Sequence, residues 1–108
     1  MNLPTEIFGN VIVVHAPDEL THDHADAFAT FISTLEKPSV VLDMDSTESL
    51  DSAGLEALVQ CQQAQRESLG DIKIATTNAN NRKILEITRL DQQFDVFHSV
   101  VDAVKSYS

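Results

Sequence analysis

The chain has 108 residues, a length that suits one small domain over residues 1–108 and is too short for two hydrophobic cores. Seven Lys and Arg against seventeen Asp and Glu give a formal net charge of -10, which argues against nucleic acid or anionic lipid as a partner. The single cysteine, Cys61, allows neither an internal disulfide nor a cysteine-based metal cluster, and it predicts a reducing, cytoplasmic compartment. No apolar run approaches the roughly 20 residues that cross a bilayer, and residues 1–6 lack the basic start of a signal peptide.

The first half of the chain alternates between strand and helix periods, which indicates an α/β domain with at least partly parallel strands. Residues 11–14 are a continuous β-branched run and predict a strand. Apolar residues then recur at helical spacing over about residues 21–36, and residues 40–44 predict a second buried strand.

The second half continues the alternation. A helix is predicted over about residues 52–69, with Leu55, Leu58 and Leu69 on its apolar side and Gly70 as its C-cap. Residues 72–76 predict a strand, and the polar run 77–81 offers several possible N-caps for the next helix. Residues 96–97 are a short strand candidate, and the capping-box spacing of residues 99–102 predicts a last helix that ends at residue 105 or 106.

The most informative segment is residues 40–55, in which a buried-type strand and a polar loop lead into Asp51-Ser52-Ala53-Gly54-Leu55 at a helix start. A helix N-terminus presents unpaired N–H groups and the positive end of the dipole, so it tolerates a phosphate on Ser52. Such a phosphate adds about −2 charge to an exposed surface. The segment therefore predicts a switchable docking surface. Its expected contact residues are Asp43, Asp45, Ser49, Asp51, Ser52, Ala53, Gly54 and Glu56.

The order of predicted elements resembles the STAS family, named for sulfate transporters and anti-sigma factor antagonists. The resemblance spans about residues 11–104 and is strongest in Asp51-Ser52-Ala53-Gly54-Leu55 and in residues 81–88, which are similar to the family's third helix. It implies a single STAS-like domain, a curved mixed sheet of four to five strands with four helices packed on it. It also implies a module that is not an enzyme, requires no cofactor and binds an anti-sigma factor while Ser52 is unmodified. The kinase that phosphorylates Ser52 would be a partner of the histidine-kinase-like ATPase fold, and a serine phosphatase would reset it.

The sequence departs from the family pattern in three places. The N-terminal strand that usually pairs with the strand at residues 11–14 would have to be residues 3–8, and because Pro4 breaks it, this edge would be short or frayed. Asp18-Glu19-Leu20-Thr21 stands where many members carry Gly-Glu-Leu-Asp, so Asp18 or Asp23 would have to supply the acidic residue near the partner. Arg89 stands where a glycine commonly ends the third helix, which would alter a local turn.

Several individual residues have more than one interpretation. Asp51 is either a second helix cap or a group that orients the Ser52 hydroxyl. Gly54 either admits another backbone at close range or is tolerated as part of a helix start. His22 and His24 suggest metal ligands, yet residues two apart on a helix point in different directions, so we expect no metal. Cys61 flanks the apolar stripe and is expected to be a packed side chain.

Two other functions compete with the anti-sigma factor antagonist hypothesis. Residues 42–45 follow an apolar strand as the phospho-acceptor aspartate of a receiver domain does, but the strand at residues 96–97 has no following basic ligand and the chain lacks five regular βα units. STAS-like modules are also accessory subunits of lipid or anion transport systems, in which the serine need not be modified. The polar helix face formed by Glu56, Gln60, Gln63 and Glu67 does not choose between the two partners.

Overall fold

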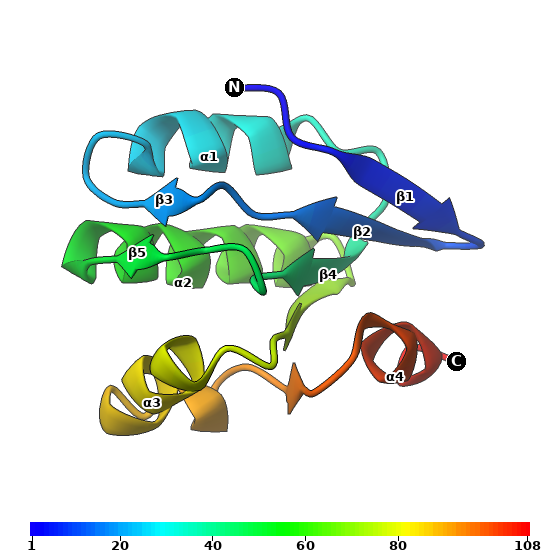
Figure 1. Cartoon of the computed structure of the whole chain (residues 1–108). Coiled ribbons are helices and arrows are strands. Elements are labelled where there is room, and N and C mark those ends of the chain that lie inside the picture. The colour runs from blue at the N-terminus through cyan, green and yellow to red at the C-terminus, as the bar shows by residue number, and fades with distance from the viewer.

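The computed structural model describes residues 1–108, and its central feature is a five-stranded mixed sheet in the order β1-β2-β4-β6-β7 (Figure 1). β1 pairs with β2 in antiparallel orientation, and the other neighbours are parallel. The strands are β1 (Thr5–Phe8), β2 (Val11–His15), β4 (Ser39–Asp43), β6 (Asp71–Ala75) and β7 (Val96–Phe97). The resemblance to the STAS family implies a mixed sheet of four to five strands, and this expectation is confirmed.

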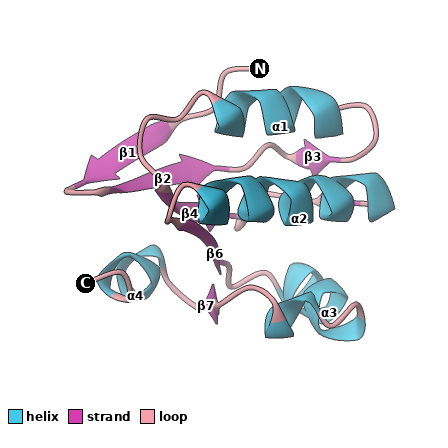
Figure 2. Ribbon diagram, turned by 180° about the vertical axis from the view of Figure 1, so that it is seen from behind, coloured by secondary structure: helices cyan, strands magenta, loops and turns pink.

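Helices cover both faces of this sheet (Figure 2). The four helices are α1 (Ala25–Ser33), α2 (Ser52–Glu67), α3 (Ala79–Ile87) and α4 (Val100–Lys105), and a 3-10 turn, Leu90–Gln92, follows α3. α1 and α2 pack on the main core, whereas α4 packs on the opposite face through Ala103. Alternate residues of β2 point to opposite faces of the sheet. Since helices cover both faces, the whole run 11–14 is buried. None of the helices is both long and apolar enough to cross a membrane.

A second, two-stranded sheet lies beyond the main one and is absent from the sequence prediction. β3 (Glu19–Leu20) pairs in parallel with β5 (Ser49–Leu50), so the loop after β4 lies against the segment that precedes α1. Strands of two residues are too short to show a period of two in the sequence. β5 ends directly before Asp51, the N-cap of α2.

Three helix ends differ from their predicted positions: both ends of α1 and the end of α2. α1 starts at Ala25 rather than near residue 21, because residues 21–24 form a turn, and it stops at Ser33. α2 ends at Glu67, and Leu69, predicted to face the core, is 96% exposed with a positive φ of 64°. Arg89 has a φ of 63°, the left-handed conformation that glycine adopts without strain.

The end of the chain is attached to the middle of the sheet. The Tyr107 hydroxyl lies 2.7 Å from the carbonyl oxygen of Val40 and 2.9 Å from that of Asp71. Its ring lies under the ammonium group of Lys73, 4.2 Å from the ring centroid. Burial raises the pKa of Tyr107. These contacts hold the segment that follows α4 against β4 and β6.

Candidate protein-binding surface around Ser52

Ser52 is the first residue of α2, and its side chain is exposed without a hydrogen-bond partner. The N-cap is Asp51, whose Oδ1 accepts a hydrogen bond of 2.9 Å from the Gly54 N–H. The capping function therefore belongs to the aspartate, as one of the two interpretations of Asp51 holds. The serine hydroxyl is left free to react or to contact another protein.

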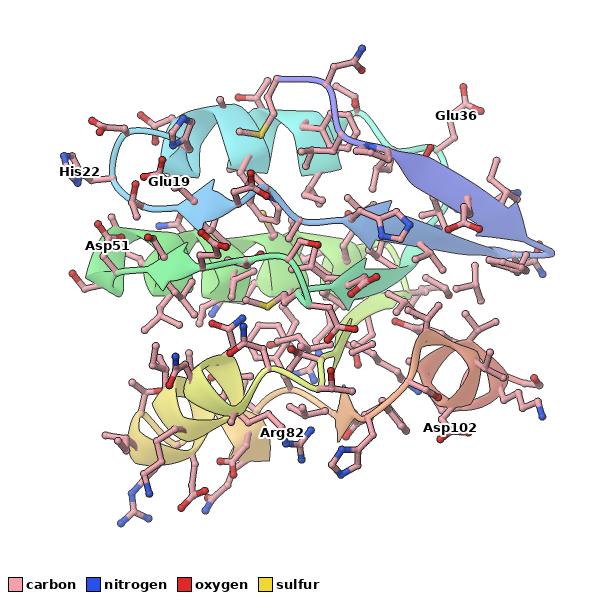
Figure 3. All side chains as sticks on the ribbon, in the orientation of Figure 1. Glu19, His22, Glu36, Asp51, Arg82 and Asp102 are labelled. Atoms are coloured by element: carbon pink, nitrogen blue, oxygen red, sulfur yellow. The ribbon has the colours of Figure 1, made fainter.

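The second oxygen of Asp51 joins α2 to the turn before α1. Oδ2 accepts a 3.0 Å hydrogen bond from the His22 backbone N–H and lies 3.3 Å from His22 Nδ1, and Figure 3 shows the two side chains at the same end of the molecule. Hydrogen bonds from the Gly54 N–H and then from the His22 N–H lower the pKa of Asp51, so the group beside Ser52 is a carboxylate at neutral pH.

Position 54 requires glycine because two backbone segments of the chain lie in close contact there. A Cβ at this position would lie 1.9 Å from the carbonyl oxygen of Leu20 in β3, far inside van der Waals contact. The same carbonyl accepts a hydrogen bond of 3.4 Å from the Asp51 N–H. A backbone does approach Gly54 closely, but it is the chain's own, so the predicted contact of the buried Gly54 with a partner stays a prediction. This close approach fixes the start of α2 against the small sheet.

The loop between β4 and β5 is held from both sides by buried polar groups. The Asn81 side-chain amide donates to the carbonyl oxygens of Met44 at 3.0 Å and Thr47 at 2.9 Å. The Thr47 hydroxyl, fully buried, donates to the carbonyl oxygen of Pro17 at 2.8 Å. Sequence reasoning missed Asn81 and Thr47, since both lie in polar runs that are typical of caps and turns. Only their burial reveals them.

The predicted contact residues form two groups in the structure. Ser49 and Asp51 line an open groove of about 530 Å³ between the small sheet and α3, which also includes Lys83. Ala53 and Glu56 line a second groove of about 210 Å³ between α1 and α2. Ser52, between Asp51 and Ala53 in the chain, separates the two sets. Grooves beside an exposed hydroxyl provide a surface that another protein can contact.

Asp43 and Asp45 line neither groove. Asp43 Oδ1 accepts a hydrogen bond of 3.0 Å from the Asp45 N–H, and Asp45 Oδ1 accepts one of 2.6 Å from the Thr77 N–H. Both carboxylates thus bind the chain's own backbone at the ends of β4 and β6. Their predicted contact with a partner stays a prediction, and the structure adds a role in holding the loop.

The candidates for other chemistry are the histidines before α1 and Cys61; of these, His24 has a buried Nδ1 without a hydrogen-bond partner. His22 lies near Asp51 and Asp23, and no group of three potential ligands converges on a metal position. Cys61, on the buried side of α2, lies in the main core, as expected for a packed side chain. Desolvation raises the pKa of its thiol to about 11.

We therefore expect Cys61 to be slow to alkylate in the native chain. At pH 8, a thiol whose pKa is about 11 has roughly 100-fold less thiolate than the same thiol when it is unfolded and solvated. Mass spectrometry of iodoacetamide-treated chain, with and without urea, measures the two rates. Similar rates in both samples would contradict burial of the thiol. Cys61→Ala should fold with a stability loss of about 1 kcal/mol.

Solved structures of several bacterial proteins resemble this chain. An anti-sigma factor antagonist from Mycobacterium paratuberculosis is 25% identical, over 97% of this chain and 92% of its own, with a TM-score of 0.81. A candidate anti-sigma factor antagonist from Thermotoga maritima is 21% identical, over 96% and 92% of the two chains, with a TM-score of 0.85. The match extends over nearly the full length of each protein.

More distant structures share the fold. The Bacillus anti-sigma factor antagonist SpoIIAA in its phosphorylated form is 14% identical, over 99% of this chain and 100% of its own, with a TM-score of 0.73. A sulfate transporter family protein from Wolinella succinogenes is 14% identical, over 94% and 87% of the two chains, with a TM-score of 0.80. Antagonists and transport proteins thus both use this arrangement of strands and helices.

The family assignment rests on the sequence and on the fold together. The STAS domain family matches residues 2–103. The five-stranded mixed sheet with four helices agrees with the fold of the solved structures above. The chain belongs to the STAS domain family.

Proposed function

We propose that the chain is a non-enzymatic binding module of the anti-sigma factor antagonist type, and that phosphorylation of Ser52 controls its contact with the partner. The observation that carries the proposal is the free, exposed hydroxyl of Ser52 at the first position of α2, beside a cap that Asp51 already supplies. A modified hydroxyl at this position leaves the cap and the helix in place.

The partner we propose is an anti-sigma factor that is also a serine kinase of the histidine-kinase-like ATPase fold. Such a partner must contact Ser52 in order to phosphorylate it, so the docking surface and the modification site coincide. The structural similarity to SpoIIAA, a protein solved in both its phosphorylated and its unphosphorylated forms, supports this assignment. A serine phosphatase restores the unmodified form. We place this exchange in the cytoplasm.

The neighbouring hydroxyls explain why Ser52 is the acceptor. The Thr47 hydroxyl is fully buried and donates to Pro17, so a kinase cannot reach it. Ser49 is half-buried within β5. Ser46 is exposed but lies in the loop rather than at a helix N-terminus, so it lacks the dipole that stabilises an added anion.

Incubation with ATP and the cognate kinase should add one phosphate to the chain, at Ser52. Peptide mapping by mass spectrometry locates it, and Ser52→Ala should gain none. Ser46→Ala is the matched control, because it removes an exposed hydroxyl from the loop and should leave the modification intact. A phosphate on Ser46 or Ser49 of the wild-type chain would contradict the proposal.

The second candidate function is that of an accessory STAS module in a lipid or anion transport system. The similarity to the Wolinella succinogenes sulfate transporter family protein favours it, since the two structures align with a TM-score of 0.80. The grooves on either side of Ser52 would then bind a transporter subunit without any modification. Capture of partners from the native lysate separates the two functions, because a kinase-like ATPase and a transporter subunit differ in sequence and size.

A further inference from the structure

His15, at the end of β2, lies between two carboxylates from the strands on either side. Its Nε2 is 2.8 Å from Glu6 Oε1 on β1, and its Nδ1 is 3.0 Å from Asp43 Oδ2 on β4. An ionised carboxylate can only accept hydrogen bonds. Both ring nitrogens must therefore donate at the same time, which requires the doubly protonated imidazolium form.

These hydrogen bonds continue beyond Asp43 into the loop that leads to Ser52. One oxygen of Asp43 accepts from His15, and the other accepts from the Asp45 N–H at 3.0 Å. The carboxylate of Asp45 then accepts from the Thr77 N–H at 2.6 Å. A continuous series of contacts thus joins the edge strand β1 to the start of the loop after β4 and to the segment after β6.

We infer that His15 is a positioning residue: as an imidazolium it fixes the Asp43 carboxylate, Asp43 fixes the backbone N–H of Asp45, and loss of the His15 proton loosens these two contacts. Neutral histidine can donate from only one ring nitrogen, so one carboxylate loses its donor. If these contacts shape the docking surface, partner binding would also depend on pH. That consequence rests on the proposed function, whereas the change at Asp43 and Asp45 does not.

The charged groups around His15 support this assignment. The hydrogen bond to Glu6 is the largest influence that raises the pKa of His15; partial burial opposes it, and Asp43 adds to it. α4 packs on the same face of β2 and carries Asp102 and Lys105, neither of which is hydrogen-bonded or ion-paired with His15. The two carboxylates are therefore the charges that hold the proton.

The raised pKa of His15 predicts that the stability of the fold decreases as the pH rises. A group whose pKa is higher in the folded chain stabilises the fold fully below its unfolded pKa, which is 6.5 for histidine. That contribution is lost as the pH rises through the folded value. Because the His15 side chain is 36% exposed, solvent weakens the two ion pairs. We expect a decrease in melting temperature on the order of 2–4 °C between pH 6 and pH 9 that is absent in His15→Gln.

Nuclear magnetic resonance of the ¹⁵N-labelled full chain tests the inference directly and needs no partner. Long-range ¹H–¹⁵N spectra distinguish an imidazolium from either neutral tautomer. At pH 6, His15 should carry protons on both nitrogens, and the backbone amide shifts of Asp45 and Thr77 should follow the His15 titration as the pH is raised. Glu6→Gln, which keeps the size of the side chain and removes its charge, should lower the His15 midpoint by about 0.5 to 1 pH unit.

Two histidine variants show whether the response of the Asp45 amide comes from His15. In His15→Gln the Asp45 amide should lose its response between pH 6 and pH 9, whereas His98→Gln, which removes an exposed histidine without a hydrogen-bond partner, should leave it unchanged. A neutral His15 at pH 6 in the wild-type chain, or an Asp45 response that persists in His15→Gln, would overturn the inference. Neither result would bear on Ser52, so the two proposals fail separately.

Discussion

If Ser52 is the switch that we propose, its phosphorylation should lower the affinity for the proposed anti-sigma factor partner by at least about 100-fold, which is about 2.7 kcal/mol. The phosphate brings about −2 charge to a position beside the Asp51 carboxylate, on a chain with a formal net charge of -10. Within a contact surface, this group must be desolvated without a compensating charge or must hold the partner away. Burial of an uncompensated charge costs several kcal/mol, so the complex should dissociate.

Three variants separate charge from shape in this experiment. Ser52→Asp adds one charge and should weaken binding less than the phosphate does, whereas Ser52→Ala removes only a hydroxyl and should bind nearly as well as wild type. Ser68→Asp adds the same charge at the exposed far end of α2 and should leave the affinity unchanged. Calorimetry measures each affinity, and circular dichroism verifies that every sample is folded. Equal affinities of the phosphorylated and unmodified forms would favour the transport-accessory function.

Gly54→Ala should destabilise the chain by about 3 kcal/mol, since overpacking of a close contact typically costs 1–3 kcal/mol and here the opposing atom belongs to the backbone. The added Cβ would lie 1.9 Å from the Leu20 carbonyl oxygen, which has no rotamer to change. α2 must then move away from β3. The movement also stretches the hydrogen bond from the Gly54 N–H to Asp51. Urea denaturation followed by circular dichroism measures the loss.

Gly9→Ala is the matched control for Gly54→Ala. Gly9 has a φ of 61°, and no atom lies within 4 Å of the position that an added methyl group would take, so alanine meets only the backbone strain of the left-handed conformation. That strain costs about 1 kcal/mol. Equal losses for the two variants would mean that glycine at position 54 is needed for reasons other than its contact with Leu20.

The sequence predicts the elements with strong periodicity and misses those that depend on tertiary contacts. The β-branched run 11–14 and the start of α2 at Ser52 are correct, because burial on both faces and a polar cap leave clear local patterns. The pair formed by β3 and β5 is too short to leave one. Leu69 looks like a continuation of the apolar stripe, but the helix ends before it.

Sequence reasoning leaves out several buried polar residues. Gln62 and Gln65 lie within the core side of α2 because their amides reach Asp71, Gln93 and the backbone of residues 37–38. His15 is uninformative in the sequence, since its carboxylate partners are 9 and 28 residues away. Strand register, which no single segment encodes, brings such groups together.

The contact between Gly54 and Leu20 bears on how the proposed phosphorylation of Ser52 would act. Two backbone segments of the chain meet there with no side chain between them, so a rotamer change cannot separate them. Asp51 fastens the same helix end to His22 through a backbone N–H. These backbone contacts hold the first turn of α2 in one position, so it does not act as a hinge. The proposed phosphate on Ser52 would change the charge of this surface and leave the shape of the module as it was, so the proposed partner would sense charge and not a movement.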